Sequence, residues 1–343
     1  MVRVGILGVG FMGTMHFNTY RAYRRAKVVA LADTDPKKLK GDWSSIAGNI
    51  EDKRAARVDL GGIRLYSKPD DLFADPDVDV VDITLPTFLH AQFAIAALKA
   101  GKHVVCEKPM ALSVADCRRM IAAAERAGRF LMVAHCIRFW PEYKVLKEIV
   151  SSRKYGKVLA ATFWRKSATP KWSWKNWLMA DERSGGAVVD LHIHDTDFVN
   201  YLLGLPKAVF SRGFAGVATK SAIDHVVTQY IYDDGPAVVA EGGWAMAPGF
   251  GFNHGFCILL QKATIEHDLK GNLPLTVHEH GGRTYKPRLP KGDGYIGELR
   301  YFVDCVAAGK EPAVVTPQDA LDALKVCLAE ARSVRTGRLV RIR

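Results

Sequence analysis

The sequence lacks the features that mark several classes of protein. None of its six cysteines stands in Cys-x-x-Cys spacing, and several lie in apolar surroundings, as reduced core cysteines do. No apolar run approaches the length of a membrane span. No signal peptide precedes the first predicted strand, which the chain has entered by Val4. These absences argue against a membrane partner and favour a cytoplasmic protein.

Internal repeats and low-complexity segments are also absent from the 343 residues, a length that suggests two domains. The apolar content of 48% is typical of a globular protein with a full core. A net charge of +12 would suit nucleic acid or acidic ligands. The Lys and Arg residues are nevertheless spread among Asp and Glu, and their densest runs, such as residues 21–25, are short. We therefore expect no nucleic-acid partner.

Alternating strands and helices occupy the first part of the chain. Strands are predicted at 2–8, 27–33, 63–67, 77–84, 103–106 and 130–135, with helices that end near 23 and span 90–100 and 113–127. The polar residues 41–60 are predicted to form an extended helix and a loop. Six strands that alternate with helices imply right-handed crossovers and a doubly wound parallel sheet. We therefore place a first domain, of the α/β class, at residues 1–130.

Beyond residue 130, strands follow one another with few helices. They are predicted at 156–164, 207–217, 225–232, 236–245, 255–260, 263–268 and 274–280. A Trp-rich polar loop is predicted at 165–180, and helices at 141–153, 299–308 and 317–336. This pattern is typical of a mostly antiparallel sheet. Residues 131–343 should therefore form a second, α+β domain.

A glycine motif follows the first strand and precedes a helix, which is the context that a dinucleotide site requires. Gly8 permits the tight turn, Gly10 lets the backbone approach a pyrophosphate, and Gly13 lets the helix pack closely on the strand. The free N–H groups at the helix amino terminus then stabilise the phosphates. Phe11 and Met12 complete the motif and are counted with its cofactor-binding residues.

An acidic residue ends the second predicted strand. Asp33 lies twenty residues past Gly13, where a carboxylate can accept hydrogen bonds from the adenosine ribose. It would repel a 2′-phosphate, so NAD is favoured, although Lys37 and Lys38 are near enough to keep NADP possible. The alternative is that Asp33 caps a helix that starts at Pro36.

A lysine stands at the carboxyl end of the strand at 103–106, in the sequence Glu107-Lys108-Pro109. Ligands of open parallel sheets bind outside the carboxyl ends of the strands. Proline fixes its own φ and keeps the preceding residue out of the helical region, so Lys108 is held in place. The alternative is a surface lysine ahead of a helix that starts at Pro109.

An acid and a histidine share a face of the helix predicted after Gly185 and Gly186. Asp190 and His194 are four residues apart, so the carboxylate can orient the imidazole, and the pair can take a proton near neutral pH. A metal site is an alternative, because His192, His194, Asp195 and Asp197 lie close together in the sequence. We predict no metal, because helical geometry spreads these side chains and no further ligand set has suitable spacing. In a purely structural alternative, Asp190 caps the helix and His194 is a core histidine.

In this order along the chain, the motifs resemble the glucose–fructose oxidoreductase / inositol dehydrogenase (Gfo/Idh/MocA) family. The resemblance covers essentially the whole chain, including Glu298–Phe302 and the closing helix near residue 320. It implies a Rossmann domain followed by a domain with a large open-faced sheet, through which members often form homodimers or homotetramers. Two departures are Pro86-Thr87, where Pro-Asn is usual, and Ala187, where a third glycine is frequent.

The resemblance also implies roles. Lys108 would contact the reacting oxygen, and Asp190 and His194 would complete the catalytic site, with His194 as the general acid/base. The remaining residues expected to bind the cofactor are Thr84, Pro86, His90, Glu107 and Lys108 itself. Those expected to bind substrate are Lys108, Arg165, Trp174, Asp190 and His194, with Arg165 and Trp174 in the loop at 165–180.

The predicted function is therefore an NAD(P)-dependent dehydrogenase that moves a hydride between a secondary alcohol carbon of a sugar or polyol and nicotinamide. An NADPH-dependent reductase of keto-sugars, imines or dihydrodiols is an alternative on the same fold. A non-enzymatic nucleotide sensor could keep the three glycines, but it would not need Lys108, Asp190 and His194. A glycosidase that uses bound NAD is a further alternative, although the amino-terminal signature expected for it is not visible.

Overall fold

A computed structural model of the chain describes residues 1–48 and 56–342. These residues form two compact units, each built from several segments of the chain. The first unit comprises Met1–Cys136, Trp172–Trp177 and Tyr295–Leu321, and the second comprises Ile137–Lys171, Leu178–Gly294 and Asp322–Arg343. Among the residues so described, no helix is both long enough and apolar enough to span a membrane.

The first unit is built on a parallel six-stranded sheet, which confirms the predicted doubly wound arrangement. Its strand order is β3-β2-β1-β4-β5-β6, and every neighbouring pair is parallel. The bounds are β1 Val2–Leu7, β2 Ala26–Ala32, β3 Arg64–Tyr66, β4 Val80–Ile83, β5 His103–Glu107 and β6 Leu131–Ala134. The strands are mostly buried and apolar because helices cover a doubly wound sheet on both faces. This is the strand order of a dinucleotide-binding fold.

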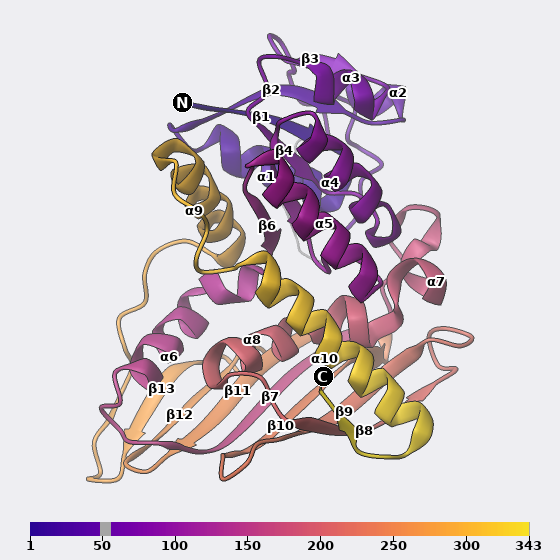
Figure 1. The fold of residues 1–343 in the computed structure, drawn as a ribbon. Coiled ribbons are helices and arrows are strands. Elements are labelled where there is room, and N and C mark those ends of the chain that lie inside the picture. Colours follow the sequence, from indigo (N-terminus) through magenta and orange to yellow (C-terminus); the bar gives the residue numbers. More distant parts are fainter. Residues whose placement is uncertain (49–55, 343) are drawn as a thin grey trace. The chain divides into compact units, whose positions relative to one another are not determined.

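Helices connect these strands, as Figure 1 shows. They are α1 Phe11–Arg21, α2 Pro36–Leu39, α3 Pro69–Ala74, η1 Thr87–Leu89, α4 His90–Lys99, α5 Val114–Ala127 and η2 Cys136–Phe139. The ends of α5 follow from its sequence, since the Ser113 side chain accepts from the Asp116 N–H and Gly128 adopts a left-handed φ of 60°. The helix predicted within residues 41–60 is absent from 41–48 and 56–60, where turns and a bridge between Asp42 and Arg57 occur. The rest of that segment lies outside the described residues.

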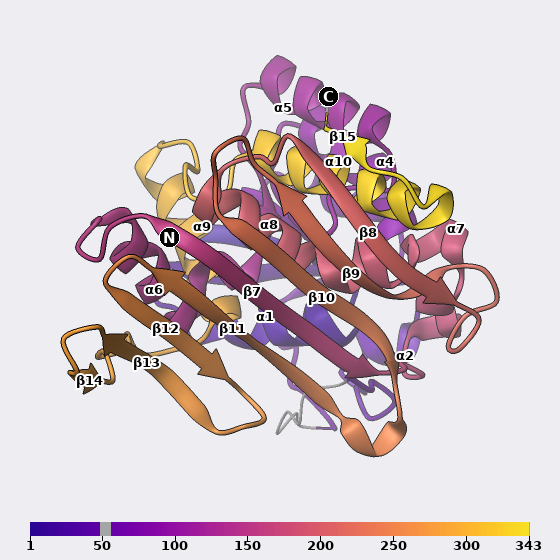
Figure 2. The same ribbon diagram turned by 90° about the horizontal axis from the view of Figure 1, so that it is seen from below.

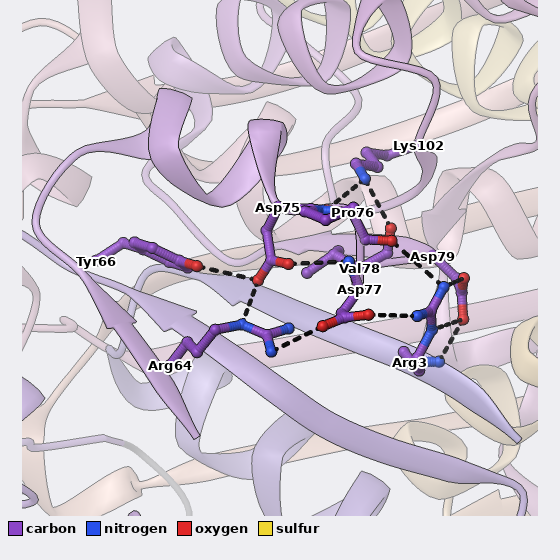
Figure 3. A network of polar contacts seen from close by, with 9 residues as sticks. All are labelled: Arg3, Arg64, Tyr66, Asp75, Pro76, Asp77, Val78, Asp79 and Lys102. Atoms are coloured by element: carbon purple, nitrogen blue, oxygen red, sulfur yellow. Dashed lines mark hydrogen bonds and ion pairs between the residues drawn. The ribbon is translucent and has the colours of Figure 1, made fainter. Parts of the chain in front are cut away.

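Charged side chains fasten the amino-terminal ends of the parallel strands (Figure 3). Arg3 at the start of β1 bonds both oxygens of Asp79, at 3.0 and 2.7 Å. Arg64 at the start of β3 bonds Asp75 at 2.6 Å. The buried ammonium of Lys102, just before β5, donates to the backbone carbonyls of Asp75 and Val78 at 2.6 and 2.9 Å. Because ligands of such sheets bind at the opposite, carboxyl edge, this network stabilises the fold and leaves the binding edge to other residues.

The second unit is built on a nine-stranded sheet in the order β14-β13-β12-β11-β7-β10-β9-β8-β15. All neighbours are antiparallel except β7 and β10, so the predicted mostly antiparallel sheet is confirmed. The bounds are β7 Val158–Ala168, β8 Ala208–Ala215, β9 Ile223–Ile231, β10 Ala237–Met246, β11 Phe252–Leu260, β12 Ala263–Asp268, β13 Leu273–Glu279, β14 Thr284–Tyr285 and β15 Val340–Arg341.

Some of the remaining helices pack on one face of this sheet. The helices that follow η2 in the chain are α6 Pro141–Ser151, η3 Trp174–Met179, α7 Asp181–Ser184, the π-helix η4 Val188–His192, α8 Ile193–Leu203, η5 Pro248–Phe250, α9 Gly294–Ala308 and α10 Pro317–Thr336. Figure 2 shows α6 and α8 behind the sheet and its other face uncovered. Four large apolar side chains of the strands in this sheet are exposed, Leu159, Phe214, Val227 and Leu259. An open-faced sheet therefore accompanies the Rossmann unit.

The division between the units differs from the predicted boundary at residue 130. The first unit continues to Cys136, because β6 pairs with β5 and completes the parallel sheet. Two later segments, 172–177 and 295–321, also belong to it, although the prediction assigned them to the second domain. Contacts distant in sequence hold both: the Trp172 ring lies 5.3 Å from that of Phe11, and the Tyr23 hydroxyl donates to Asp304 at 2.6 Å.

Candidate active site

The glycine motif forms the turn from β1 into α1. Gly8 has a left-handed φ of 99°, as a tight turn requires. A Cβ at Gly13 would lie 2.0 Å from the Gly8 carbonyl oxygen, so only glycine allows this approach of helix to strand. A Cβ at Gly10 would meet nothing within 4 Å, and Gly10 precedes α1 without a side-chain cap. The open space at the amino terminus of α1 fits the pyrophosphate of a dinucleotide.

Asp33, just after β2, is held beside this turn. One carboxylate oxygen accepts from the Val9 N–H at 2.7 Å, and the other accepts from the Asp35 N–H at 2.8 Å. The cap of the short helix α2 is Asp35, whose side chain accepts from Lys37, so the alternative that Asp33 caps this helix is wrong. The Lys38 ammonium lies 3.5 Å from Asp33. Each carboxylate oxygen keeps accepting capacity for a ribose hydroxyl.

Two other residues predicted to bind the cofactor fasten neighbouring loops. The Thr84 hydroxyl, after β4, donates to the Gly8 carbonyl at 2.6 Å and so links β4 to the glycine turn. His90 is 1% exposed, and its ring nitrogens lie 2.8 Å from the Pro109 carbonyl and 2.7 Å from the Leu85 carbonyl. This burial favours a supporting role for His90 over the predicted contact with the cofactor. Pro86, which precedes η1, is half-buried.

Lys108 lies at the carboxyl end of β5, half-buried, between the buried Glu107 and Pro109. Its backbone N–H donates to a Glu107 carboxylate oxygen at 3.1 Å. The following helix, α5, begins at Val114, so the alternative that places a helix start at Pro109 is wrong. The lysine is therefore at the edge of the sheet where ligands bind.

A buried histidine, His16, lies one turn beyond the glycine motif and contacts two carboxylates. Its Nδ1 is 2.8 Å from Asp82 and its Nε2 is 3.2 Å from Glu107. Burial alone would lower the pKa of His16, but the two carboxylates raise this pKa well above its usual value. Burial would raise the pKa of Glu107, yet its bond to His16 keeps that pKa below its usual value. The ring therefore carries a positive charge.

The carboxylate of Glu298 on α9 completes a group with His16 and Glu107. The ligand-type atoms of the three side chains lie within 4.8 Å of one another, and no other such group occurs among the described residues. A cation in this place would have to displace the proton that makes His16 an imidazolium. The cluster instead joins α1, β4, β5 and α9 beneath Lys108. Sequence reasoning missed it, although a histidine three residues past Gly13 was the available signal.

The predicted acid–histidine pair lies where the π-helix η4 passes into α8. Asp190 is in η4 and His194 in α8, and both are half-buried. The N-cap of η4 is Ala187, so the alternative in which Asp190 caps the helix is wrong. His194 is half-buried rather than fully buried. The two glycines ahead of the turn have φ of 75° and 72°, and wide π turns of this kind are frequent at functional sites.

The neighbouring residues proposed for a metal site each bind a different partner. Asp195 accepts from the buried Arg165 at 2.8 Å, and Asp197 accepts from Arg138 at 2.9 and 2.6 Å. His192 contacts the Tyr230 hydroxyl at 3.4 Å. These side chains do not converge, so the metal interpretation of this segment is wrong.

The predicted loop at 165–180 begins later than expected, because β7 continues to Ala168. Pairing with β10 and β11 extends the strand through Arg165, which is 3% exposed and bound to Asp195. The placement of Arg165 in a loop was therefore wrong. Trp174 is the first residue of the short helix η3 and is 51% exposed, and its segment belongs to the first unit. The substrate contacts assigned to Arg165 and Trp174 stay predictions.

A closed ring of buried polar side chains, absent from the predictions, lies beside η4. Thr196 contacts the Tyr230 hydroxyl at 3.0 Å and Glu330 at 3.1 Å, and His192 lies 3.4 Å from Tyr230 and 3.5 Å from Glu330. Burial raises the pKa of Glu330 to about 7 and lowers that of His192 to about 3. The ring joins η4 and α8, which carry Asp190 and His194, to β9 and α10.

Comparison with known proteins assigns a family description to each half of the chain. A model described as an oxidoreductase family with an NAD-binding Rossmann fold matches residues 2–135. A model described as the GFO/IDH/MocA C-terminal domain matches residues 143–266. The first match covers the whole parallel sheet, and the second covers β7 to β11 and part of β12. They agree with the strand order and the glycine motif of the first unit.

Similar proteins align with almost the entire chain. Myo-inositol 2-dehydrogenase of Thermotoga maritima is 29% identical, covering 99% of this chain and 98% of that protein. Scyllo-inositol 2-dehydrogenase (NAD(+)) of Bacillus subtilis is 27% identical, with coverages of 99% and 96%. A crystal structure of a probable dehydrogenase from Thermotoga maritima is 27% identical with a TM-score of 0.82, covering 99% of both chains. Levoglucosan dehydrogenase in complex with NADH and levoglucosan shares the fold, at 23% identity, 99% coverage of both chains and a TM-score of 0.85.

Proposed function

The chain belongs to the Gfo/Idh/MocA family of oxidoreductases, and from this premise we propose that it transfers a hydride between a secondary alcohol carbon of a sugar or polyol and the nicotinamide of NAD. The observation that carries the proposal is Lys108, a half-buried cation at the carboxyl end of β5 in an NAD-binding sheet. The relatives that are named inositol dehydrogenases support the substrate class.

One set of residues is proposed to bind the cofactor. NAD, when bound, supplies the ring carbon that accepts the hydride. Gly8, Gly10 and Gly13 would hold the pyrophosphate at the amino terminus of α1, and Asp33 would bind the ribose. Phe11, Met12, Thr84, Pro86, His90 and Glu107 line or support this cofactor site in the proposal.

The substrate is handled by three side chains. His194 accepts the proton of the substrate hydroxyl as the hydride leaves carbon. The Lys108 ammonium stabilises the negative charge that develops on that oxygen. Asp190 orients His194 or another substrate hydroxyl. Arg165 and Trp174 are proposed as further substrate contacts.

A purified-protein assay tests this proposal. NADH absorbance would be followed with NAD and a panel of inositols, aldoses and sugar acids. Lys108→Ala and His194→Ala should each lower kcat by about a hundredfold, the scale of acid/base and charge-stabilising residues. Lys99→Ala and His280→Ala, both at exposed positions, are matched controls that should keep full activity. Normal turnover by both site variants would overturn the mechanism.

The same proposal includes a homodimer or homotetramer that forms through the uncovered face of the nine-stranded sheet. The exposed apolar side chains of β7, β9 and β11 support this surface. A cytoplasmic location also stays a prediction, which cell fractionation can test.

A further inference from the structure

Lys108 is flanked by two buried side chains that hold its backbone in place. On one side, the Glu107 carboxylate accepts from the Lys108 N–H at 3.1 Å, and its other oxygen lies 3.2 Å from His16. On the other side, the carbonyl of Pro109 lies 2.8 Å from Nδ1 of His90. Residues 108–113 form bends between β5 and α5, so these side chains take the place of ladder or helix bonds there.

His90 reaches two loops at once. It is the first residue of α4, and its Nε2 lies 2.7 Å from the carbonyl of Leu85, which closely follows β4. Its Nδ1 bonds Pro109, which follows β5. The ring therefore bridges the carboxyl ends of two adjacent strands, directly behind the lysine. Since it is 1% exposed, it holds the loops without contact with solvent.

Both ring nitrogens of His90 lie within hydrogen-bond distance of an acceptor. Both partners are carbonyl oxygens, which only accept, and a neutral imidazole has a single N–H. Burial lowers the pKa of His90, and Lys108 acts in the same direction, whereas the two carbonyls and Glu107 raise that pKa. Burial is the largest of these causes, and the pKa of His90 lies below its usual value. A neutral ring donates to one of the two carbonyls, and its other nitrogen lies beside the second.

We propose that His90 is a positioning residue for Lys108: by bridging the Leu85 and Pro109 carbonyls it fixes the lysine for hydride transfer without touching substrate or coenzyme. This inference rests on the proposed function, in which Lys108 stabilises the reacting oxygen. A displacement of about 1 Å in such a group can cost about a hundredfold in rate.

The test is a double-mutant cycle with His90→Gln and Lys108→Ala. His90→Gln should lower kcat at least about tenfold in the wild-type background and less than about twofold in the Lys108→Ala background. A general structural role would lower kcat equally in both. The dissociation constant of NADH, followed by its fluorescence, should change less than about twofold, because the glycine turn is intact. Circular dichroism checks folding, and His90→Asn replaces His90→Gln if the latter does not fold.

His103→Gln is the matched control. His103 lies at the opposite, amino end of β5, and its Nδ1 also bonds backbone, accepting from the Phe130 N–H at 3.0 Å. It should keep kcat within about twofold. Unchanged kcat in His90→Gln, or equal losses in both backgrounds, would overturn the positioning role. If Lys108→Ala itself were fully active, the proposed function would fail first, so the two failures are distinguishable.

Discussion

At the scale of single residues, coenzyme choice depends on the charges beside the ribose site. The Asp33 carboxylate would repel a 2′-phosphate, and the Lys38 ammonium lies 3.5 Å from it. Asp33→Ser removes this repulsion and leaves Lys38 without the Asp33 carboxylate beside it. We expect the ratio of NADPH to NADH affinity to rise at least about tenfold, which is about 1.4 kcal/mol. Fluorescence titration of both coenzymes measures the ratio.

Two variants separate these charges. Lys38→Ala added to Asp33→Ser should remove most of the gain, because the remaining cation is lost. Asp35→Asn changes a nearby acid that caps α2 and should leave the ratio close to that of the wild type. A ratio that does not respond to Asp33→Ser would contradict the assignment of this residue to the ribose.

The sequence predicts best those residues whose roles are local. Gly8 and Gly13 were identified from their spacing, because a tight turn and a close approach require glycine within a few positions. His16 was missed because the carboxylate that charges it, Asp82, is 66 positions away. Arg165 was misplaced for a similar reason, since the strands that extend β7 lie far along the chain. The periodicity of apolar residues within one segment does not predict contacts with residues that are distant in the sequence.

At the scale of elements, the buried ring at Glu330 couples α10 to the π-helix that carries Asp190. Burial raises the pKa of Glu330 from 4.5 to about 7, so the folded state holds its proton more tightly than the unfolded state. The stability that this proton contributes is complete below pH 4.5 and is lost as the pH rises to about 7. By linkage the loss is about 3 kcal/mol.

The variant Glu330→Gln isolates this effect because its amide does not titrate. The free energy of unfolding of the wild type, relative to Glu330→Gln, should fall by about 3 kcal/mol between pH 4.5 and pH 8, as measured by urea denaturation. His192, whose pKa is lowered to about 3, contributes a trend of opposite sign below pH 6.5 in both proteins. A difference that does not vary with pH would show that Glu330 is ionised throughout.

Whole elements were largely predictable. The six strands of the first sheet and strands β7 to β13 of the second were predicted, and α10 spans residues 317–336 as predicted. The two-residue strands β14 and β15 were missed. The grouping of these elements into units was less predictable. Helix α9 joins the first unit through contacts such as that between Tyr23 and Asp304, which are 281 positions apart. Where a chain leaves one domain and later returns to it, its amino-acid composition does not mark the boundary.

At the scale of the whole molecule, the uncovered face of the nine-stranded sheet predicts self-association. In the second halves of β9 and β11, buried residues alternate with more exposed ones, so the exposed Val227 and Leu259 point away from the helices. Their side chains are 41% and 37% exposed, an apolar surface that a second copy of the sheet would cover. Val227→Arg would place an unpaired charge in that contact, which is costly to desolvate.

We therefore expect Val227→Arg and Leu259→Arg to shift the particle mass in light scattering toward that of one chain, 37.8 kDa, while the wild type elutes as a dimer or tetramer. Leu205→Arg is the matched control, since Leu205 is 48% exposed but follows α8 outside the sheet, and it should leave the mass unchanged. If the wild type were itself a single chain, or if the control dissociated as readily, the sheet face would not be the interface. Successive side chains of a strand point to opposite faces of the sheet, and the neighbouring Thr228 is buried. Thr228→Arg would therefore place a charge in the core and unfold the unit. The effect on self-association is accordingly specific to the face that carries Val227.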